Sequence, residues 1–231
     1  MEPRPRFLGQ LGAADAVTVG NAMLGFAATA AVLTDLSLSA RLVLLAGIAD
    51  GLDGFVARHA GSSAVGTYLD SLADVASFGV APAMLVVAVA HAVYAGTTLP
   101  FLAAVAVAAL FVGMAVVRLA LYTANDADDR ETEGVQSTLA GTLLAALYLA
   151  GLPGVDGTRG ALVFVALAGA FAYLMVTRVP YPELTDRDAL AMGAVQALAA
   201  IAPTALSRAF PRLLAAVAVA YLLLAPRFYW R

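Results

Sequence analysis

The chain has 231 residues, of which 62% are hydrophobic and 13% charged, and its mean hydropathy is +0.87. Because soluble domains carry about 25% charged residues, this composition excludes an ordinary soluble protein and indicates an integral membrane protein. The formal net charge of −3 gives no reason to expect nucleic-acid binding, and the lack of cysteine excludes disulfides and thiolate chemistry.

Apolar stretches recur along the whole chain. A spanning helix needs about 20 mainly apolar residues. The pattern predicts an all-α, polytopic membrane protein with about eight transmembrane helices. Their approximate ranges, in chain order, are Asp15–Leu33, Ala40–Ala57, Gly66–Ala95, Leu99–Tyr122, Val135–Leu152, Gly160–Val179, Ala189–Leu206 and Ala209–Pro226.

We expect one membrane domain over residues 1–231, with a catalytic core at about 15–180 and extra C-terminal helices at about 189–226. A very short connection separates the last two helices, so they either both cross the membrane or form a re-entrant pair. The count of eight assumes that both cross. Residues 1–10 are polar and contain two prolines, so no secretory signal is expected.

The distribution of arginine predicts that both termini lie in the cytoplasm, because short cytoplasmic loops are enriched in positive charge. With the N-terminus inside, nine arginines fall on the cytoplasmic side and four on the outer side. The inner set is Arg4, Arg6, Arg58, Arg118, Arg130, Arg178, Arg187, Arg227 and Arg231, and the outer set is Arg41, Arg159, Arg208 and Arg212. The turn at residues 58–65 then faces the cytoplasm.

Four aspartates stand out between residues 50 and 74: Asp50, Asp53, Asp70 and Asp74. A carboxylate at membrane depth is costly, so such residues usually face a cavity and have a function. On a helix, Asp50 and Asp53 share one face, and Asp70 and Asp74 share another. The short turn between the two helices would bring these faces together and form a pocket of four carboxylates.

Small residues accompany the aspartates on the same faces. Gly54 and Ala57 follow Asp53 at helical spacing, and Gly66 precedes Asp70 by one turn. Their size would let a bulky ligand approach the helix backbone.

Carboxylate ligands suit a hard divalent cation, Mg²⁺ or Mn²⁺ with Ca²⁺ possible, rather than zinc. Two cations would balance the charge of four aspartates. Since Mg²⁺ commonly combines carboxylates with substrate phosphates, the residues predict a metal-dependent site for a phosphate-bearing ligand. The alternative is that the aspartates are solvated helix caps.

The pattern Asp50-x-x-Asp53-Gly54-x-x-Ala57-Arg58, followed by Gly66-x-x-x-Asp70-x-x-x-Asp74, resembles the signature of the CDP-alcohol phosphatidyltransferases. The next residues, through Ala83, are similar to the phosphatidylserine synthase branch. The resemblance implies transfer of a phosphatidyl-type group, with diacylglycerol or archaeol chains, from a CDP-activated lipid to L-serine, with release of CMP. It also implies two divalent cations held by the four aspartates, and a homodimer.

The resemblance further implies individual roles. Asp74, the last residue of the signature, is the expected general base, and Arg118 and Ser77 are expected to bind the acceptor. The expected CDP-lipid-binding residues are Thr18, Asn21, Gly54, Ala57, Arg58 and Gly66. For Thr18 and Asn21 the alternative is hydrogen bonding within their own helix, and for Arg58 it is extension toward lipid head groups.

Arg118 lies in an apolar helix, where an arginine is costly unless an anion meets it. A planar guanidinium can bind a carboxylate or a phosphate with two hydrogen bonds. The alternative is an arginine that extends to the membrane surface. Arg118-Leu-Ala matches the phosphatidylserine synthase branch, but the next residues, Leu121–Thr123, depart from it. That branch also has a Gly-Leu-Pro-x-Pro segment, and the corresponding residues 134–138 here contain no proline.

Other functions stay open at this point. Glycerol 3-phosphate or inositol phosphate are alternative acceptors, although both would need more basic anchors than Arg58 and Arg118 supply. A cation transporter is the alternative from another class, but it would distribute carboxylates across the bilayer. The acidic stretch Asp126–Glu133 is predicted to be a solvated loop.

Overall fold

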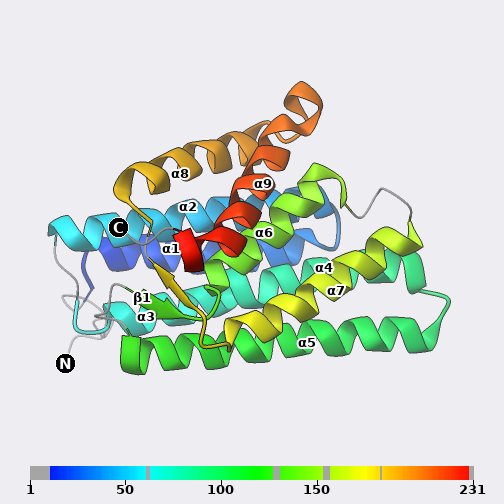
Figure 1. Cartoon of the computed structure of the whole chain (residues 1–231), viewed down its shortest axis with the longest axis horizontal. Helices are drawn as coiled ribbons and strands as arrows, with labels where there is room; N and C mark the ends of the chain where they lie inside the picture. The colour runs from blue at the N-terminus through cyan, green and yellow to red at the C-terminus, as the bar shows by residue number, and fades with distance from the viewer. Residues whose placement is uncertain (1–10, 61–62, 127–130, 153–156, 183, 229–231) are drawn as a thin grey trace, which may run out of the picture.

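The computed structural model describes residues 11–60, 63–126, 131–152, 157–182 and 184–228. Over these residues the predicted all-α class is confirmed, with the addition of one small sheet (Figure 1). The elements in chain order are α1 (Ala13–Ala31), α2 (Leu36–Ala60), α3 (Gly66–Asp74), η1 (Val75–Val80), α4 (Ala81–Tyr94), α5 (Thr98–Leu121), η2 (Tyr122–Asp126), β1 (Glu131–Glu133), α6 (Ser137–Ala150), α7 (Thr158–Met175), β2 (Pro180–Pro182), α8 (Asp186–Ile201) and α9 (Ala205–Phe228).

Each of the eight predicted ranges contains a helix. Helix α2 is longer than expected at both ends. It begins at Leu36 because the Asp35 carboxylate accepts hydrogen bonds from the backbone N–H groups of Ser37 and Leu38, at 2.8 and 3.1 Å. It continues to Ala60, so Arg58 lies in the helix and not in the turn where we expected it.

Among the described residues, four helical segments are long and apolar enough to cross a membrane: Gly66–Tyr94, Thr98–Ala124, Thr158–Met175 and Ala205–Phe228. Helix α6 is apolar but shorter. The structure thus supports a helical membrane protein, while the number of eight crossings stays a prediction.

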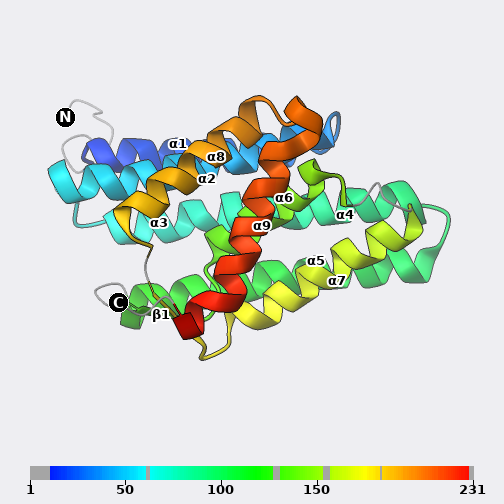
Figure 2. The same ribbon diagram turned by 45° about the horizontal axis from the view of Figure 1, so that its top comes forward.

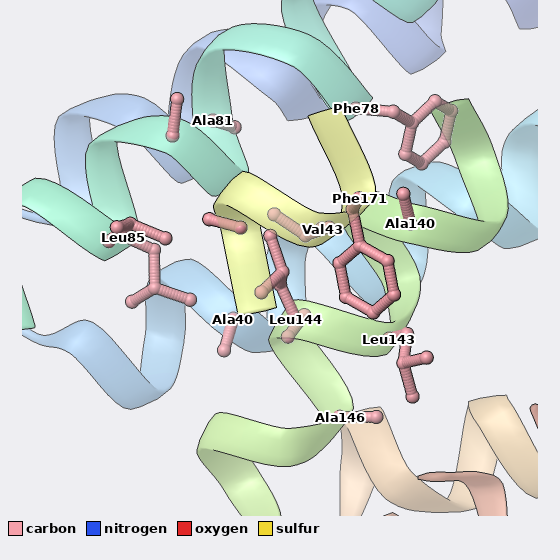
Figure 3. Packing of buried hydrophobic residues seen from close by; sticks show 14 of the residues in the cluster. Ala40, Val43, Phe78, Ala81, Leu85, Ala140, Leu143, Leu144, Ala146 and Phe171 are labelled. Carbon is pink, nitrogen blue, oxygen red and sulfur yellow. The ribbon is translucent and has the colours of Figure 1, made fainter. Parts of the chain in front are cut away.

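Helix α6 lies at the centre of the bundle. It packs against α2 on one side and α9 on another, α1 packs along α2, α5 along α7, and α8 covers α2 (Figures 1 and 2). Figure 3 shows part of the core, to which α2 contributes Val43, α6 contributes Leu144 and α7 contributes Phe171. Because α6 is buried on nearly all sides, its first turn is held firmly inside the protein.

The third predicted helix is continuous but contains a wide turn, η1. Here the N–H of Ala81 donates to the carbonyl of Ala76, a bond that spans five residues instead of four. Such π-helical turns occur frequently at functional sites. The turn separates α3, which carries Asp70 and Asp74, from α4.

A two-stranded antiparallel sheet joins β1 to β2, with Thr132 opposite Tyr181. This corrects the prediction of a solvated loop over Asp126–Glu133. Residues 127–130 lie outside the described part, but the last three residues form a strand, and Thr132 is buried. Local sequence did not reveal the strand because its partner lies about 50 residues later in the chain.

Candidate active site

Three of the four predicted aspartates come together, Asp50 from α2 and Asp70 and Asp74 from α3. One carboxylate oxygen from each of Asp50, Asp70 and Asp74 lies within 4.8 Å of the others. Asp74 is buried, and the other two are half-buried. Like charges so close together, away from bulk water, repel strongly unless a cation balances them. These three residues are called the carboxylate cluster below.

Asp53 lies outside the carboxylate cluster, so a pocket formed by all four carboxylates stays a prediction. It is buried and accepts a hydrogen bond from Thr18 Oγ1 at 2.7 Å. Residues three apart on an α-helix differ in direction by about 60°. Asp53 therefore turns toward α1, while Asp50 turns toward α3.

Helix α1 contributes two polar side chains to the aspartates. Asn21 is fully buried, and its Nδ2 donates to Asp74 Oδ1 at 3.3 Å. Its Oδ1 is also buried and has no hydrogen-bond partner. The Thr18 hydroxyl donates to both Asp53 and the carbonyl of Ala14, so Thr18 and Asn21 form hydrogen bonds outside their own helix as well as within it.

This donor set fits a hard divalent cation. It consists of oxygen ligands only, from three carboxylates, with the unpartnered Asn21 Oδ1 on the residue that binds Asp74. Mg²⁺, Mn²⁺ and Ca²⁺ all prefer such ligands.

Thr138, in the first turn of α6, contacts the carboxylate cluster from the other side. Its hydroxyl lies 3.5 Å from Asp50 Oδ2 and 3.4 Å from Asp74 Oδ2. The positive end of the helix dipole therefore lies next to two negative side chains, which is a favourable arrangement. No role was predicted for Thr138 from the sequence. Its only signal was the polar run Gln136–Thr138 at the start of an apolar helix.

A cavity of about 160 Å³ opens beside the carboxylate cluster and is called the site cavity below. The aspartates lie on one side of it, and residues of α5, η2, β1 and the start of α6 complete it. Its lining consists of Asp50, Asp70, Asp74, Arg118, Leu119, Tyr122, Thr132, Gln136, Ser137 and Thr138.

Arg118 is buried in the wall of the site cavity, which excludes the alternative of an arginine that extends to the membrane surface. Its Nε donates to the carbonyl of Val135 at 3.3 Å, and its Nη2 donates to the Thr132 hydroxyl. The guanidinium carbon lies 5.4 Å from the centre of the Tyr122 ring. These contacts hold the positive charge in the same cavity as the aspartates.

Ser77 does not line the site cavity, and its role in acceptor binding stays a prediction. The residue is fully buried in η1, and its hydroxyl donates to the carbonyl of Asn21 at 2.8 Å. The contact joins η1 to α1, so in this structure Ser77 has a packing role.

The remaining predicted residues, Gly54, Ala57, Arg58 and Gly66, are also absent from the lining of the site cavity. Arg58 is exposed. A Cβ added at Gly54 would meet Arg58 Nη1 at 3.6 Å and nothing else within 4 Å, so there is free space beside this glycine. Their role in CDP-lipid binding stays a prediction.

Comparison with known proteins gives consistent matches. The family model described as CDP-alcohol phosphatidyltransferase matches residues 11–177. The archaetidylserine synthase of Methanothermobacter thermautotrophicus is 30% identical over 151 residues, which cover 64% of this chain and 59% of the relative.

Two relatives share the name CDP-diacylglycerol–serine O-phosphatidyltransferase. The protein from Methanocaldococcus jannaschii is 47% identical over 72 residues, or 31% of this chain and 33% of the relative. The protein from Bacillus subtilis is 31% identical over 175 residues, or 75% of this chain and 91% of the relative. The chain thus matches less than two thirds of the length of the first two relatives and nearly all of the third.

Proposed function

The chain belongs to the CDP-alcohol phosphatidyltransferase family, and we propose that it transfers a phosphatidyl-type group from a CDP-activated lipid to the hydroxyl of L-serine, releasing CMP. Diacylglycerol and archaeol chains are both considered, since one relative is named for archaetidylserine and another for CDP-diacylglycerol. The observation that carries the proposal is the presence of the carboxylate cluster and the buried Arg118 in one small cavity.

The carboxylate cluster would hold a divalent cation, with Mg²⁺ or Mn²⁺ preferred and Ca²⁺ possible. When bound, a cation would neutralise charge on the diphosphate and on the departing CMP. The signature also implies a second cation, for which Asp53 is the remaining carboxylate, although here it accepts a hydrogen bond from Thr18.

In the reaction, the serine hydroxyl oxygen forms a bond to the lipid-linked phosphorus, and the bond from that phosphorus to CMP breaks. The hydroxyl proton needs an acceptor, and Asp74 is our candidate for this base. It lines the site cavity, and its two oxygens are oriented by Asn21 and Thr138. A base must lie within hydrogen-bond reach of the proton that it takes.

The site cavity favours a small acceptor with a single negative group. Its volume of about 160 Å³ is below the roughly 300–1,000 Å³ of pockets for drug-sized ligands. Among its described lining residues, Arg118 alone is positively charged. A guanidinium can bind the serine carboxylate through two hydrogen bonds. Glycerol 3-phosphate and inositol phosphate would bring a more highly charged phosphate and are the alternative acceptors.

We further propose a multi-pass protein of the cell membrane with eight crossings, an active site that faces the cytoplasm, and assembly as a homodimer. The arginine distribution supports the orientation. The start of α1 and the end of α9 lie toward the same end of the bundle, as an even number of crossings requires (Figure 1). The dimer rests on the family resemblance alone.

An acceptor screen tests the proposed reaction. Membranes with the expressed protein receive CDP-diacylglycerol or CDP-archaeol, Mg²⁺ or Mn²⁺, and serine, glycerol 3-phosphate or inositol phosphate in turn, and CMP release is followed. We expect release with serine. Preference for glycerol 3-phosphate would overturn the choice of acceptor, and no release with any acceptor would overturn the activity.

A further inference from the structure

The last helix of the chain reaches back to the strands that border the site cavity. Helix α9 lies beyond residues 11–177, the part that matches the family model. It crosses α6 obliquely and ends beside the β1–β2 sheet, as the two views in Figures 1 and 2 agree. A segment outside the shared family region therefore touches the surroundings of the proposed active site.

Two tyrosines join α9 to β2 by reciprocal hydrogen bonds, and we call this pair the tyrosine brace. The hydroxyl of Tyr221 in α9 donates to the carbonyl of Pro182 in β2 at 2.6 Å. The hydroxyl of Tyr181 in β2 donates to the carbonyl of Leu222 in α9 at 3.2 Å. The ring centres are 6.2 Å apart, so the two aromatic side chains also contact each other.

The chemistry of proline explains why the tyrosine brace matters for both segments. In α9, residue 226 is a proline and lacks the N–H that would bond to the Leu222 carbonyl, and Tyr181 donates to this oxygen instead. In β2, the two prolines Pro180 and Pro182 leave Tyr181 as the only residue with a backbone donor for pairing. A strand with so few donors gains from anchors outside the sheet.

The strand β2 in turn supports the residue that orients Arg118. Tyr181 pairs with Thr132 in β1, and the N–H of Gly134 donates to the Val179 carbonyl at 2.9 Å. The Thr132 hydroxyl then accepts from Arg118 Nη2. A continuous series of contacts therefore leads from α9 through β2 and β1 to the guanidinium in the site cavity.

We propose that Tyr181 and Tyr221 are positioning residues for the acceptor, because the tyrosine brace holds β1 in the place where Thr132 orients Arg118. This inference rests on the proposed function, in which Arg118 binds the serine carboxylate. Loosening the brace should weaken serine binding and leave CDP-lipid binding unchanged, because the residues proposed for the CDP-lipid lie on α1, α2 and α3.

The test compares Tyr221→Phe and Tyr181→Phe with Tyr94→Phe in the purified full-length protein. The control removes the same kind of bond, since the Tyr94 hydroxyl donates to the carbonyl of Thr158 at 3.0 Å, away from the site cavity. Steady-state kinetics give the KM for serine and for CDP-lipid. Hydrogen–deuterium exchange of the amides of residues 131–136 reports on β1 independently of activity.

Loss of one such hydrogen bond should raise the KM for serine by about threefold to tenfold in each brace variant. The KM for CDP-lipid should stay within about twofold of wild type, and exchange in β1 should accelerate. Tyr94→Phe should change none of these values.

Serine KM and β1 exchange that match the control would overturn the proposal, as would a lower melting temperature with both KM values unchanged. A wild-type protein that does not use serine would overturn the proposed function instead, and the exchange data would still decide whether the brace holds β1.

Discussion

Gly25 of α1 lies directly against the backbone of Ser77 in η1. A Cβ added at Gly25 would be 2.7 Å from both the Cα and the N of Ser77, a distance at which Cβ atoms essentially never lie from other heavy atoms. One turn away, the Ser77 hydroxyl holds the carbonyl of Asn21, and the Asn21 side chain holds Asp74. The close approach of two backbones thus sets the position of a residue in the proposed site.

We predict that Gly25→Ala destabilises the protein, because overpacking of this kind costs about 1–3 kcal/mol. Gly20→Ala in the same helix is the matched control. A Cβ at Gly20 would meet nothing within 4 Å, and alanine favours a helix over glycine by about 1 kcal/mol. Thermal unfolding in detergent should therefore show a lower melting temperature than wild type for Gly25→Ala and a higher one for Gly20→Ala. Equal melting temperatures would contradict the packing described here.

The carboxylate cluster should be essential for chemistry. Asp50→Asn, Asp70→Asn and Asp74→Asn keep the side-chain shape but remove the charge that a cation needs, so CMP release should fall by about a hundredfold or more. EDTA should have the same effect on wild type, and added Mg²⁺ or Mn²⁺ should reverse it.

Asp35→Asn is the control for these variants. Asp35 is exposed and caps α2, a role that asparagine fills equally well, so activity and stability should be unchanged. Normal turnover by Asp70→Asn or Asp74→Asn would refute the metal site.

The hydroxyl of Thr138 should support the cation through Asp50 and Asp74. Thr138→Val removes the hydroxyl and keeps the shape, so half-maximal activity should need about ten times more Mg²⁺, as is typical when a partner of a metal ligand is lost. Thr138→Ser should restore the wild-type requirement. A metal titration of CMP release checks both variants, and identical curves for Val and wild type would remove Thr138 from the site.

The free space beside Gly54 should matter for the CDP-lipid. Gly54→Leu would fill this space and should raise the KM for CDP-lipid strongly or abolish activity. Gly54→Ala should be milder, since its Cβ would only touch Arg58. Both changes favour the helix, and thermal unfolding in detergent checks that both variants are folded. If Gly54→Leu has a normal KM for CDP-lipid, the nucleotide lies elsewhere.

The geometry of Arg118 should select the acceptor. Arg118→Lys keeps the charge but loses the planar set of donors that bonds Val135 and Thr132. We expect the KM for serine to rise by about tenfold or more, with a much smaller change for CDP-lipid. The reverse pattern would show that Arg118 binds the lipid phosphate instead. Arg118→Gln with both values unchanged would assign the residue a purely structural role.

The sequence was sufficient to predict the helices, because long apolar runs are strong signals. It was not sufficient for β1 and β2. Three-residue strands show no periodicity, and Pro180-Tyr181-Pro182 looks like a break between helices. Pairing across about 50 residues is a property of the folded chain, so the buried Thr132 could not be distinguished from its acidic neighbours.

The site was predicted best where its residues are close in sequence. The spacing of Asp70 and Asp74 placed them on one face, and Asp50 joined them across a short turn. Thr138 lies 88 residues from Asp50 and 64 from Asp74, so only tertiary packing brings it there. Ser77 was assigned to the acceptor by resemblance, whereas its burial depends on how η1 meets α1.

The wide turn at Val75–Val80 changes the direction in which the side chains of α4 point around the helix axis, relative to those of α3. An α-helix turns by about 100° per residue, so the extra residue in η1 rotates α4 by about that angle relative to α3. One unbroken helix can therefore direct Asp70 and Asp74 toward the site cavity while Leu85 and Val89 face the core. Deleting one residue of η1 would restore a regular α-helix. The aspartates of α3 could then no longer face the site cavity while the apolar residues of α4 face the core.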